Sequence, residues 1–406
     1  MAKLTHEVRC GIHGFIRFNN LERTLIDSGP FQRLRDIHQL AMTYHVYPGA
    51  THTRFEHSLG VMEFAGRVFD SVFSEDKLTG ELKDRLGDHL TKASLAYWRS
   101  VVRVAGLLHD IGHLPFSHAA EDLLPDGWNH ERVTAEMIRN SEIKAVLEAI
   151  RPQIQPEDVV DLCWDAKKRA KVEPERALPE WQAILSELIT GNTFGADRID
   201  YLLRDGLHAG VPYGRFGPDR LIQGLRLVVD PSDDTIKVGL DFGAIHAAEA
   251  LLLARYFMYT QVYLHDVRRV YDVHLKDYLK AWLPGGRYPS DWEELLKMTD
   301  TEVISAMRSD FADESSDRHA KVACVMARQH YRTVFEAKGE DFVKGEQMLS
   351  DLHTRLSSIF GADAVRRDWM KPKQEVNRFP VIDDEGQVQD SIMVSHVISQ
   401  IPPVGF

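Results

Sequence analysis

Apolar residues recur at helical spacing through most of this chain, and this periodicity constrains the fold more than any other feature. Within 59–69 and 101–108 the apolar positions repeat every three or four residues, as on the buried face of an amphipathic helix. Strand-like alternation is scarce before residue 225 and occurs at 225–242 and 378–398, where Glu385 and Gly386 indicate a hairpin turn. The sequence therefore predicts a mostly α fold with a minor β part.

The length of 406 residues exceeds the size at which one hydrophobic core stops growing, so we expect one large domain with a smaller appendage, or two domains. The segment LPGGRYP at 283–289 interrupts the helical pattern and is our predicted boundary. A helical core then occupies 1–282, and a small helical or α+β C-terminal region occupies 283–406. The charged segment 165–179 has no sustained periodicity and is predicted to be an exposed loop.

Net charge, cysteine content and hydropathy indicate which partners and which cell compartment to expect. The net charge is −12, which repels a long polyanion, so long nucleic acid is a poor partner. Three widely separated cysteines form neither a disulfide framework nor a zinc-ribbon spacing. The amino terminus lacks the apolar run of a signal peptide, and no stretch is apolar enough to cross a membrane. We therefore expect a cytoplasmic protein without membrane contact.

Histidine is the residue type whose distribution asks for an explanation, because it serves both metal binding and proton transfer near neutral pH. Of the 19 histidines, four lie within 101–130: His109, His113, His118 and His130. The segment LLHDIGHLPFSH places the first of them, followed by Asp110, near the end of an apolar helix. Taken alone, a His-Asp dipeptide is more often a solvated helix end than a metal site.

Two further clusters of polar residues argue against the interpretation as a solvated helix end. The segment HTRFEHSLGVMEF at 52–64 places Arg54 and His57 at the start of an amphipathic helix. The segment ADRIDYLLRDGLHAG at 196–210 predicts one helical stripe of functional groups, flanked by Arg198 and Asp205. The stripe consists of Asp197, Tyr201, Arg204 and His208. A solvated face with intrahelical ion pairs is the alternative for these charges.

The segments HTRFEHS, LLHDIGHLPFSH, NHE and ADRIDYLLRD, in this order, resemble those of the HD-domain phosphohydrolases. More narrowly, the chain is similar to the deoxynucleoside triphosphate triphosphohydrolases related to the human SAM-and-HD-domain enzyme and to bacterial dGTPase-like enzymes. The resemblance begins at GIHGFIRF and fades near 331–336. It implies that the core over 1–282 is an HD-domain helical core.

The resemblance implies that one divalent metal ion is held by four residues: His57, His109, Asp110 and Asp197. Two imidazoles and two carboxylates suit Mn²⁺, Mg²⁺, Fe²⁺ or Zn²⁺ without choosing among them. Such an ion polarises a phosphoryl group and lowers the pKa of bound water.

The resemblance also implies which residues contact a deoxynucleoside triphosphate. Guanidinium groups suit a triphosphate because they present several donors to phosphate oxygens. The triphosphate is assigned to Arg54, Arg198, Tyr201 and Arg255, the sugar ring to Gln39, Leu40 and Tyr263, and the 3′ side of the sugar to Asp205. For Leu40 and for Leu264, which stands where a relative has Gln, plain core packing is an equal alternative. The preferred base therefore stays open.

Proton transfer is assigned, again by resemblance, to a histidine–carboxylate set that protonates the departing 5′ oxygen and orients the attacking water. The set consists of His118, His130, Glu121 and Glu131, with His113 beside the triphosphate. Glu121 replaces the Asp of the human relative, and this leaves open which carboxylate supports which histidine.

Asp27, Gln32 and Arg35 match positions that bind a guanine nucleotide activator in regulated relatives, and they are our candidate effector site. The usual DPIHG is CGIHG at 10–14, and Asp266 stands where a phosphate-contacting Lys is expected. We therefore predict that effector binding is altered or absent. Family members assemble as homo-oligomers, so a dimer, tetramer or hexamer is expected.

The leading hypothesis is metal-dependent hydrolysis of deoxynucleoside triphosphates to deoxynucleoside and inorganic triphosphate. An HD-type phosphodiesterase or single-strand 3′–5′ exonuclease is the second hypothesis, and the net charge and the lack of a basic, aromatic-interleaved stripe weigh against it. The third is a non-catalytic nucleotide sensor, which has no need of intact metal and proton-transfer residues.

Overall fold

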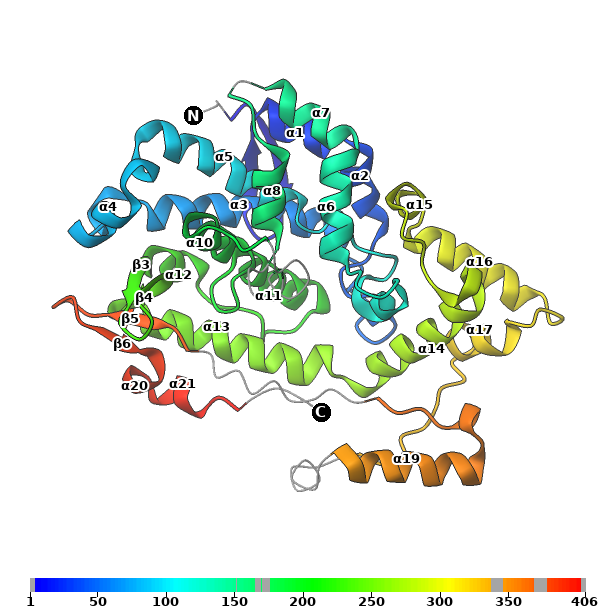
Figure 1. The fold of residues 1–406 in the computed structure, drawn as a ribbon. Coiled ribbons are helices and arrows are strands. Elements are labelled where there is room, and N and C mark those ends of the chain that lie inside the picture. The colour runs from blue at the N-terminus through cyan, green and yellow to red at the C-terminus, as the bar shows by residue number, and fades with distance from the viewer. Residues whose placement is uncertain are drawn as a thin grey trace.

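The computed structural model describes residues 4–150, 152–164, 169, 176–336, 346–368 and 378–402. Its centre is a bundle of helices that supplies the metal-ligand candidates. Helix α3 (Arg54–Val72) packs against α5 (Lys92–Leu108) and α11 (Ala196–Ala209), and α8 (Pro156–Cys163) and α10 (Glu180–Thr190) complete the bundle. The prediction of a mostly α fold with a minor β part is confirmed (Figure 1).

The segments 59–69 and 101–108, whose apolar residues recur at helical spacing, lie in helices that are largely buried in the bundle. Residues 101–108 are buried on every side, because this end of α5 lies between α3 and α8. The amino-terminal half of α5 is only partly buried, so the helix runs from the surface into the core. His109 and Asp110 follow directly after it, at the inner end.

Shorter helices cover this bundle. They are α1 (Asn20–Ile26), α2 (Gly29–Gln32), α4 (Gly80–Leu86), α6 (His130–Asn140), α7 (Glu142–Ala149) and α12 (Pro218–Gly224). Short 3-10 segments lie between the elements: η1 (Arg33–Asp36), η2 (Thr43–His45), η3 (Glu75–Lys77), η4 (Gly87–Leu90), η5 (Ser117–Leu123) and η6 (Phe242–Ala244). Among these, η5 and α6 bear on function because they carry His118 and His130.

Two small sheets flank the helices. The pair β3 (Leu225–Asp230) and β4 (Thr235–Asp241) is antiparallel and confirms the strands predicted at 225–242. The predicted C-terminal hairpin is also present: β5 (Pro380–Ile382) and β6 (Val388–Asp390) are antiparallel, and Gly386 has a positive φ of 80° in the turn. Strand β5 pairs in parallel with β4, so this hairpin extends the sheet of the core (Figure 1).

An additional hairpin, β1 (His6–Cys10) and β2 (Gly14–Phe18), was not predicted. Each strand has five residues, and only Ile16 and Phe18 are buried, so the alternation is too brief to stand out in the sequence. The turn places His13 against the bundle, where its Nε2 lies 3.4 Å from Oδ1 of Asp200.

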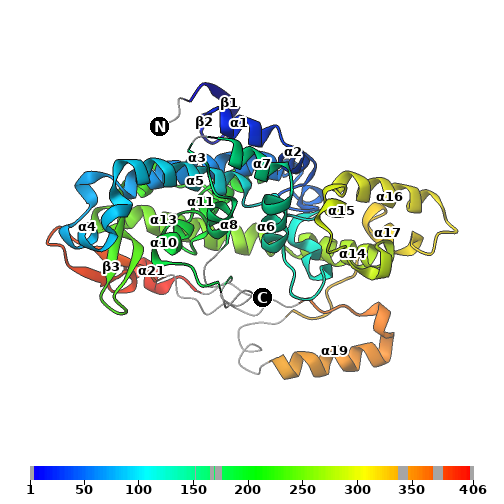
Figure 2. The same cartoon turned by 45° about the horizontal axis from the view of Figure 1, so that its top comes forward.

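The second half of the chain forms a helical wall beside the bundle. Helix α13 (Ile245–Met258) continues through a π-helical turn (Tyr259–Tyr263) into α14 (Asp266–Trp282). Helix α14 ends at the predicted interruption, which contains the 3-10 turn η8 (Pro284–Gly286). Then follow α15 (Trp292–Leu296), α16 (Asp300–Ala312) and α17 (His319–Met326), which pack with α14 to one side of the bundle (Figures 1 and 2).

The last described helices are peripheral. Helix α19 (Glu346–Phe360) and the turn η9 (Ala362–Ala364) stand apart from the bundle in both views (Figures 1 and 2). By contrast, α20 (Ser391–Val394) and α21 (His396–Gln400) pack near the sheet, where α20 contacts β5 and β6 (Figure 1). The boundary predicted near 283 stays a prediction. Most of the predicted loop 165–179 lies outside the described residues, but Arg169 within it is buried and pairs with Asp161. None of the helices within the described ranges is long and apolar enough to cross a membrane.

Candidate metal centre and active-site cavity

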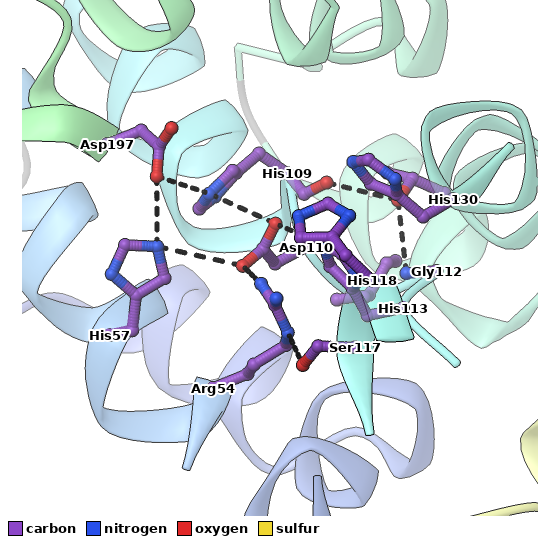
Figure 3. Close-up of polar contacts among 12 residues, drawn as sticks. Arg54, His57, His109, Asp110, Gly112, His113, Ser117, His118, His130 and Asp197 are labelled. Carbon is purple, nitrogen blue, oxygen red and sulfur yellow. Dashed lines mark hydrogen bonds and ion pairs between the residues drawn. The ribbon is translucent and has the colours of Figure 1, made fainter. Parts of the chain in front are cut away.

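Three elements bring the predicted metal ligands together (Figure 3). His57 comes from the first turn of α3, His109 from the residue after α5, and Asp197 from the first turn of α11. One ligand atom of each lies within 4.8 Å of the others. Asp110 completes the group, with its Oδ2 3.6 Å from Nε2 of His57 and its Oδ1 3.3 Å from Nε2 of His109.

The hydrogen bonds of the two histidines suit metal ligands. Nδ1 of His57 donates to Oδ2 of Asp200 at 2.8 Å, and Nδ1 of His109 donates to the carbonyl of Gly106 at 2.9 Å. Each Nε2 therefore turns its lone pair toward the carboxylates, which is the arrangement of metal-binding histidines. Nε2 of His109 is buried and has no hydrogen-bond partner among the described residues. This orphaned atom and the mixed nitrogen and oxygen donor set fit a divalent cation.

Asp200 is a functional residue that the sequence analysis missed. It is fully buried and also accepts hydrogen bonds from Nε and Nη2 of Arg204, at 2.8 and 2.9 Å. The predicted functional stripe on α11 is therefore wrong for Arg204, because that side chain points into the contact with α3, where Glu56 also pairs with it at 3.0 Å. The alternative of an intrahelical ion pair is the one realised, in buried form. Asp200 was detectable as the acceptor that a ligating His57 requires on its other nitrogen.

The charges of this group are strongly coupled. Burial alone would raise the pKa of Asp110, but the charges of Arg54, His109 and His113 lower it well below its usual value. Burial alone would lower the pKa of His57, but Asp197 and Asp200 raise it to about 10. A bound cation would displace that proton, so metal affinity should increase with pH.

A second group of histidines lies beside the first (Figure 3). Glu121 in η5 accepts hydrogen bonds from Nδ1 of His118 at 2.8 Å, from Nδ1 of His130 at 2.5 Å and from the backbone N–H of His130 at 2.9 Å. Glu121 therefore supports both histidines, which answers a question left open by the sequence. Glu131 lies nearby and accepts a hydrogen bond from the side chain of Asn129 at 2.8 Å.

The histidines of this second group differ in the direction in which their surroundings shift their pKa values. Burial and the guanidinium of Arg54 hold the pKa of His113 well below its usual value, so this ring is neutral at pH 7. Burial opposes protonation of His130 as well, but the charge of Glu121 and its hydrogen bond raise the pKa of His130. The three rings thus differ in their readiness to give up a proton.

A cavity of about 910 Å³ connects these two groups with most of the predicted substrate residues. The predicted residues that line it are Gln39, Leu40, Arg54, His109, Asp110, His113, His118, His130, Glu131, Asp197, Arg198, Tyr201, Asp205 and Tyr263. His57 and Glu121 are not in the lining and bond to residues that are. Arg255 also lies outside the lining, close enough to Arg198 for the two positive charges to interact, and its pKa is lowered by burial and by Arg198.

Two guanidinium groups in this region differ in their contacts. Nε and Nη1 of Arg198 are buried and have no hydrogen-bond partner within the described part of the chain. Arg54 is buried and bonded to Asp110 and, at 2.7 Å, to the hydroxyl of Ser117. Buried donors without acceptors are costly, so Arg198 suits an anionic ligand that enters the cavity.

Asp205 and Tyr263, which also line the cavity, belong to a further, smaller polar group. The hydroxyl of Tyr263 donates to Oδ2 of Asp205 at 2.7 Å, and Nε2 of His52 contacts Oδ1 of Asp205 at 2.7 Å. His52 is buried and stacks on His208, with 4.4 Å between the ring centroids. His208 of the predicted stripe therefore supports Asp205 through His52 instead of lining the cavity.

The candidate effector residues lie outside this cavity. Asp27 is exposed and pairs with Arg23 at 3.5 Å. Nε of Arg35 donates to Oε1 of Gln32 at 2.8 Å, and the guanidinium of Arg35 covers the ring of Phe55. Their role in effector binding stays a prediction.

Comparisons with known proteins agree with this architecture. The HD domain family matches residues 54–178, and the HD associated region family matches residues 218–359. The protein MJ1154 of Methanocaldococcus jannaschii is 29% identical, over 93% of this chain and 72% of its own length. The human deoxynucleoside triphosphate triphosphohydrolase SAMHD1 is 30% identical over 82% of this chain, which spans 55% of that enzyme.

A solved structure supports the same assignment. The crystal structure of a hypothetical protein from Aquifex aeolicus superposes with a TM-score of 0.76 at 33% identity, covering 98% of this chain and 94% of that one. The fold and the histidine–aspartate cluster define a metal-dependent hydrolase of the HD superfamily. More narrowly, the chain belongs to the HD-domain family that includes the deoxynucleoside triphosphate triphosphohydrolases.

Proposed function

We propose that this protein hydrolyses deoxynucleoside triphosphates to deoxynucleoside and inorganic triphosphate, with one divalent ion of Mn²⁺, Mg²⁺, Fe²⁺ or Zn²⁺. The observation that carries the proposal is that a single cavity joins the metal-ligand group, the guanidinium groups of Arg54 and Arg198, a histidine–carboxylate set and the Asp205–Tyr263 pair. Human SAMHD1 carries this activity in its name.

The triphosphate is the part of the substrate that the half-buried guanidinium groups of Arg198 and Arg255 fit. Arg198 offers donors without protein acceptors, and Arg255 lies close enough for its positive charge to add to the same region. Together they bind a polyphosphate inside a protein whose net charge is −12, because the local field and not the total charge decides the affinity. Arg54 is held against Asp110 and places a third positive charge beside the reacting phosphorus.

The reaction breaks the bond between the α-phosphorus and the 5′ oxygen, while the oxygen of water forms a new bond to that phosphorus. His57, His109, Asp110 and Asp197 would hold a divalent ion, and such an ion would supply polarisation of the α-phosphoryl group and a lower pKa for water. The pKa of His130 is raised by Glu121, so His130 is a better proton donor to the departing 5′ oxygen than His113 or His118, whose pKa values are lowered by burial. His118 shares the same carboxylate, and His113 is held neutral beside it.

The sugar is assigned to the part of the cavity that Asp205 lines. Oδ1 and Oδ2 of Asp205 each accept one hydrogen bond and retain a lone pair for the 3′ hydroxyl. Tyr263, Gln39 and Leu40 line the same cavity and are assigned to pack against the sugar ring, where a 2′ hydroxyl would clash, so a deoxyribose is favoured.

The two alternative functions, a single-strand exonuclease and a non-catalytic nucleotide sensor, need other features in the cavity than a triphosphohydrolase does. An exonuclease needs free cations along the path of the strand, and three of the arginines that line the cavity are held in ion pairs: Arg268 with Asp272, Arg269 with Asp368, and Arg366 with Asp277. A sensor needs no histidine–carboxylate set. A nucleotide effector and a homo-oligomer of two, four or six chains remain predictions from the family resemblance.

The test is product analysis by chromatography with the four deoxynucleoside triphosphates and with labelled single-stranded oligonucleotides. Deoxynucleoside plus inorganic triphosphate is the expected result, whereas mononucleotides released from the oligonucleotides would replace the proposal by the exonuclease. Asp197→Ala should reduce turnover by more than ~100-fold, because it removes a proposed metal ligand. The matched control is Asp219→Ala, whose side chain is 77% exposed and pairs with Arg67 outside the cavity.

A further inference from the structure

Three histidine rings that the proposed function uses for proton transfer also form a compact donor group. The rings of His113 and His130 are stacked, with 4.0 Å between centroids, and the ring of His118 stands nearly perpendicular to both at 4.7 and 5.0 Å. One ring nitrogen of each lies within 4.8 Å of the other two. This group is separate from the group of His57, His109 and Asp197.

Glu121 prepares two of these rings for metal binding. Because its carboxylate accepts from Nδ1 of both His118 and His130, the proton of each neutral ring stays on Nδ1 and the lone pair on Nε2. Within the described residues, neither Nε2 takes part in a hydrogen bond between protein groups. A carboxylate behind a histidine is the arrangement that orients metal-binding imidazoles.

Asp110 lies between the two groups (Figure 3). Its Oδ1 is 3.3 Å from Nε2 of His113, and its Oδ2 is 3.6 Å from Nε2 of His57. A carboxylate in this position faces a cation on either side, so the repulsion between two neighbouring cations is partly offset.

We propose that His113, His118 and His130 form a second cation site, which takes a transition-metal ion such as Zn²⁺ and rejects Mg²⁺. Three imidazoles and an open fourth position are a common zinc environment, whereas Mg²⁺ prefers oxygen ligands in an octahedral arrangement. His118 is 61% exposed, so an ion enters from solvent without opening the bundle.

One consequence rests on the proposed function. An ion at this site occupies the ring nitrogens that would otherwise move protons to the 5′ oxygen. Zn²⁺ in excess of the first site should therefore inhibit turnover supported by the first ion, and Mg²⁺ in the same excess should not.

The test is isothermal titration calorimetry of Zn²⁺ and of Mg²⁺ into metal-free full-length protein. We expect two Zn²⁺ ions per chain in the wild type, and one in His118→Ala and in His130→Ala. Asp197→Ala should keep the second site and lose the first. Glu121→Gln should weaken only the second site, by ~10–100-fold, since it removes the charge that orients two ligands.

The matched control is His246→Ala. His246 is 90% exposed, and its Nδ1 contacts Oε2 of Glu249 three residues later at 2.7 Å, which reproduces the His118–Glu121 contact without the other two rings. This variant should bind two Zn²⁺ ions. Circular dichroism of each variant shows whether a loss of binding reflects unfolding, and His118→Ala alters an exposed side chain.

One Zn²⁺ per chain in the wild type, or two in both His118→Ala and His130→Ala, would overturn the second site. Equal losses in His246→Ala and His118→Ala would also overturn it, by showing adventitious binding to surface histidines. A second Zn²⁺ that leaves turnover unchanged would keep the site and contradict the proton-transfer role of these histidines, so the two failures are distinguishable.

Discussion

At the scale of single residues, Asp200 links the metal-ligand group to the packing of the protein. Its carboxylate orients His57 from one side and neutralises Arg204 from the other, in a region from which water is excluded. A buried charge pair contributes little net stability, but removing one partner leaves an uncompensated charge. Replacing Asp200 should therefore lower both metal affinity and stability.

Asp200→Asn tests this role. We expect metal affinity to fall by ~10–100-fold, because the amide orients Nδ1 of His57 without a full negative charge. The free energy of unfolding should fall by ~3–5 kcal/mol, since the buried guanidinium of Arg204 loses the carboxylate of its main partner. Calorimetric metal titration and thermal unfolding measure the two effects. Asp219→Asn, at an exposed Asp–Arg pair, should change neither, and unchanged metal affinity in Asp200→Asn would refute the role.

At the scale of elements, the site depends on how closely α3 and α11 approach each other. Gly60 of α3 faces Asp200 and Arg204 of α11, and a Cβ atom at this position would lie 2.6 Å from Cγ of Asp200. Glycine is therefore required here for space and not for backbone conformation. The carboxylate that orients His57 occupies the volume that any other side chain would need.

Gly60→Ala should destabilise the protein by ~1–3 kcal/mol, the usual cost of overpacking, and should weaken metal binding because Asp200 is displaced. Gly80→Ala is the matched control, because Gly80 begins α4 and a Cβ there has no neighbour within 4 Å. Chemical denaturation and metal titration of both variants provide the measurement. Equal behaviour of the two variants would show that the helices adjust without cost.

At the scale of the whole molecule, the C-terminal segment supports the loop that precedes Asp197. The ring of Phe379 packs edge-on against that of Phe194 with 4.7 Å between centroids, and both side chains are buried. Hydrogen bonds between Phe379 and Ser391 at 3.0 and 3.2 Å close the segment on itself. Residues nearly two hundred positions apart thus meet beside the metal-ligand group.

Phe379→Ala should lower the free energy of unfolding by ~3–5 kcal/mol, as expected for loss of a buried aromatic side chain. Metal affinity should fall as well, because the loop carrying Phe194 leads directly into α11 and Asp197. Met393→Ala, which truncates a side chain that is 77% exposed, should leave both unchanged. If Phe379→Ala loses stability but binds metal as the wild type does, the support does not reach the site.

The amino-acid sequence was sufficient for the features that depend on neighbouring residues. Helical periodicity predicted α3, α5 and α11, and the alternation at 225–242 and around Gly386 predicted four of the six strands in the described part of the chain, because local propensity and burial act together there. The motif order also indicated the group of His57, His109, Asp110 and Asp197, which the fold brings together.

Tertiary structure decided which of several polar side chains on one helix face the cavity. Asp200 and Arg204 lie on the same helix as Asp197 and Tyr201, and only the packing of α3 against α11 buries the first pair and leaves the second beside the cavity. The sharing of Glu121 by His118 and His130, and the contact of His52 with Asp205, likewise join residues from separate elements. The sequence therefore determined the elements and the types of chemical group that they carry, whereas only the packing of helices against each other decided which groups meet, because side-chain partners across elements depend on distances that no local pattern encodes.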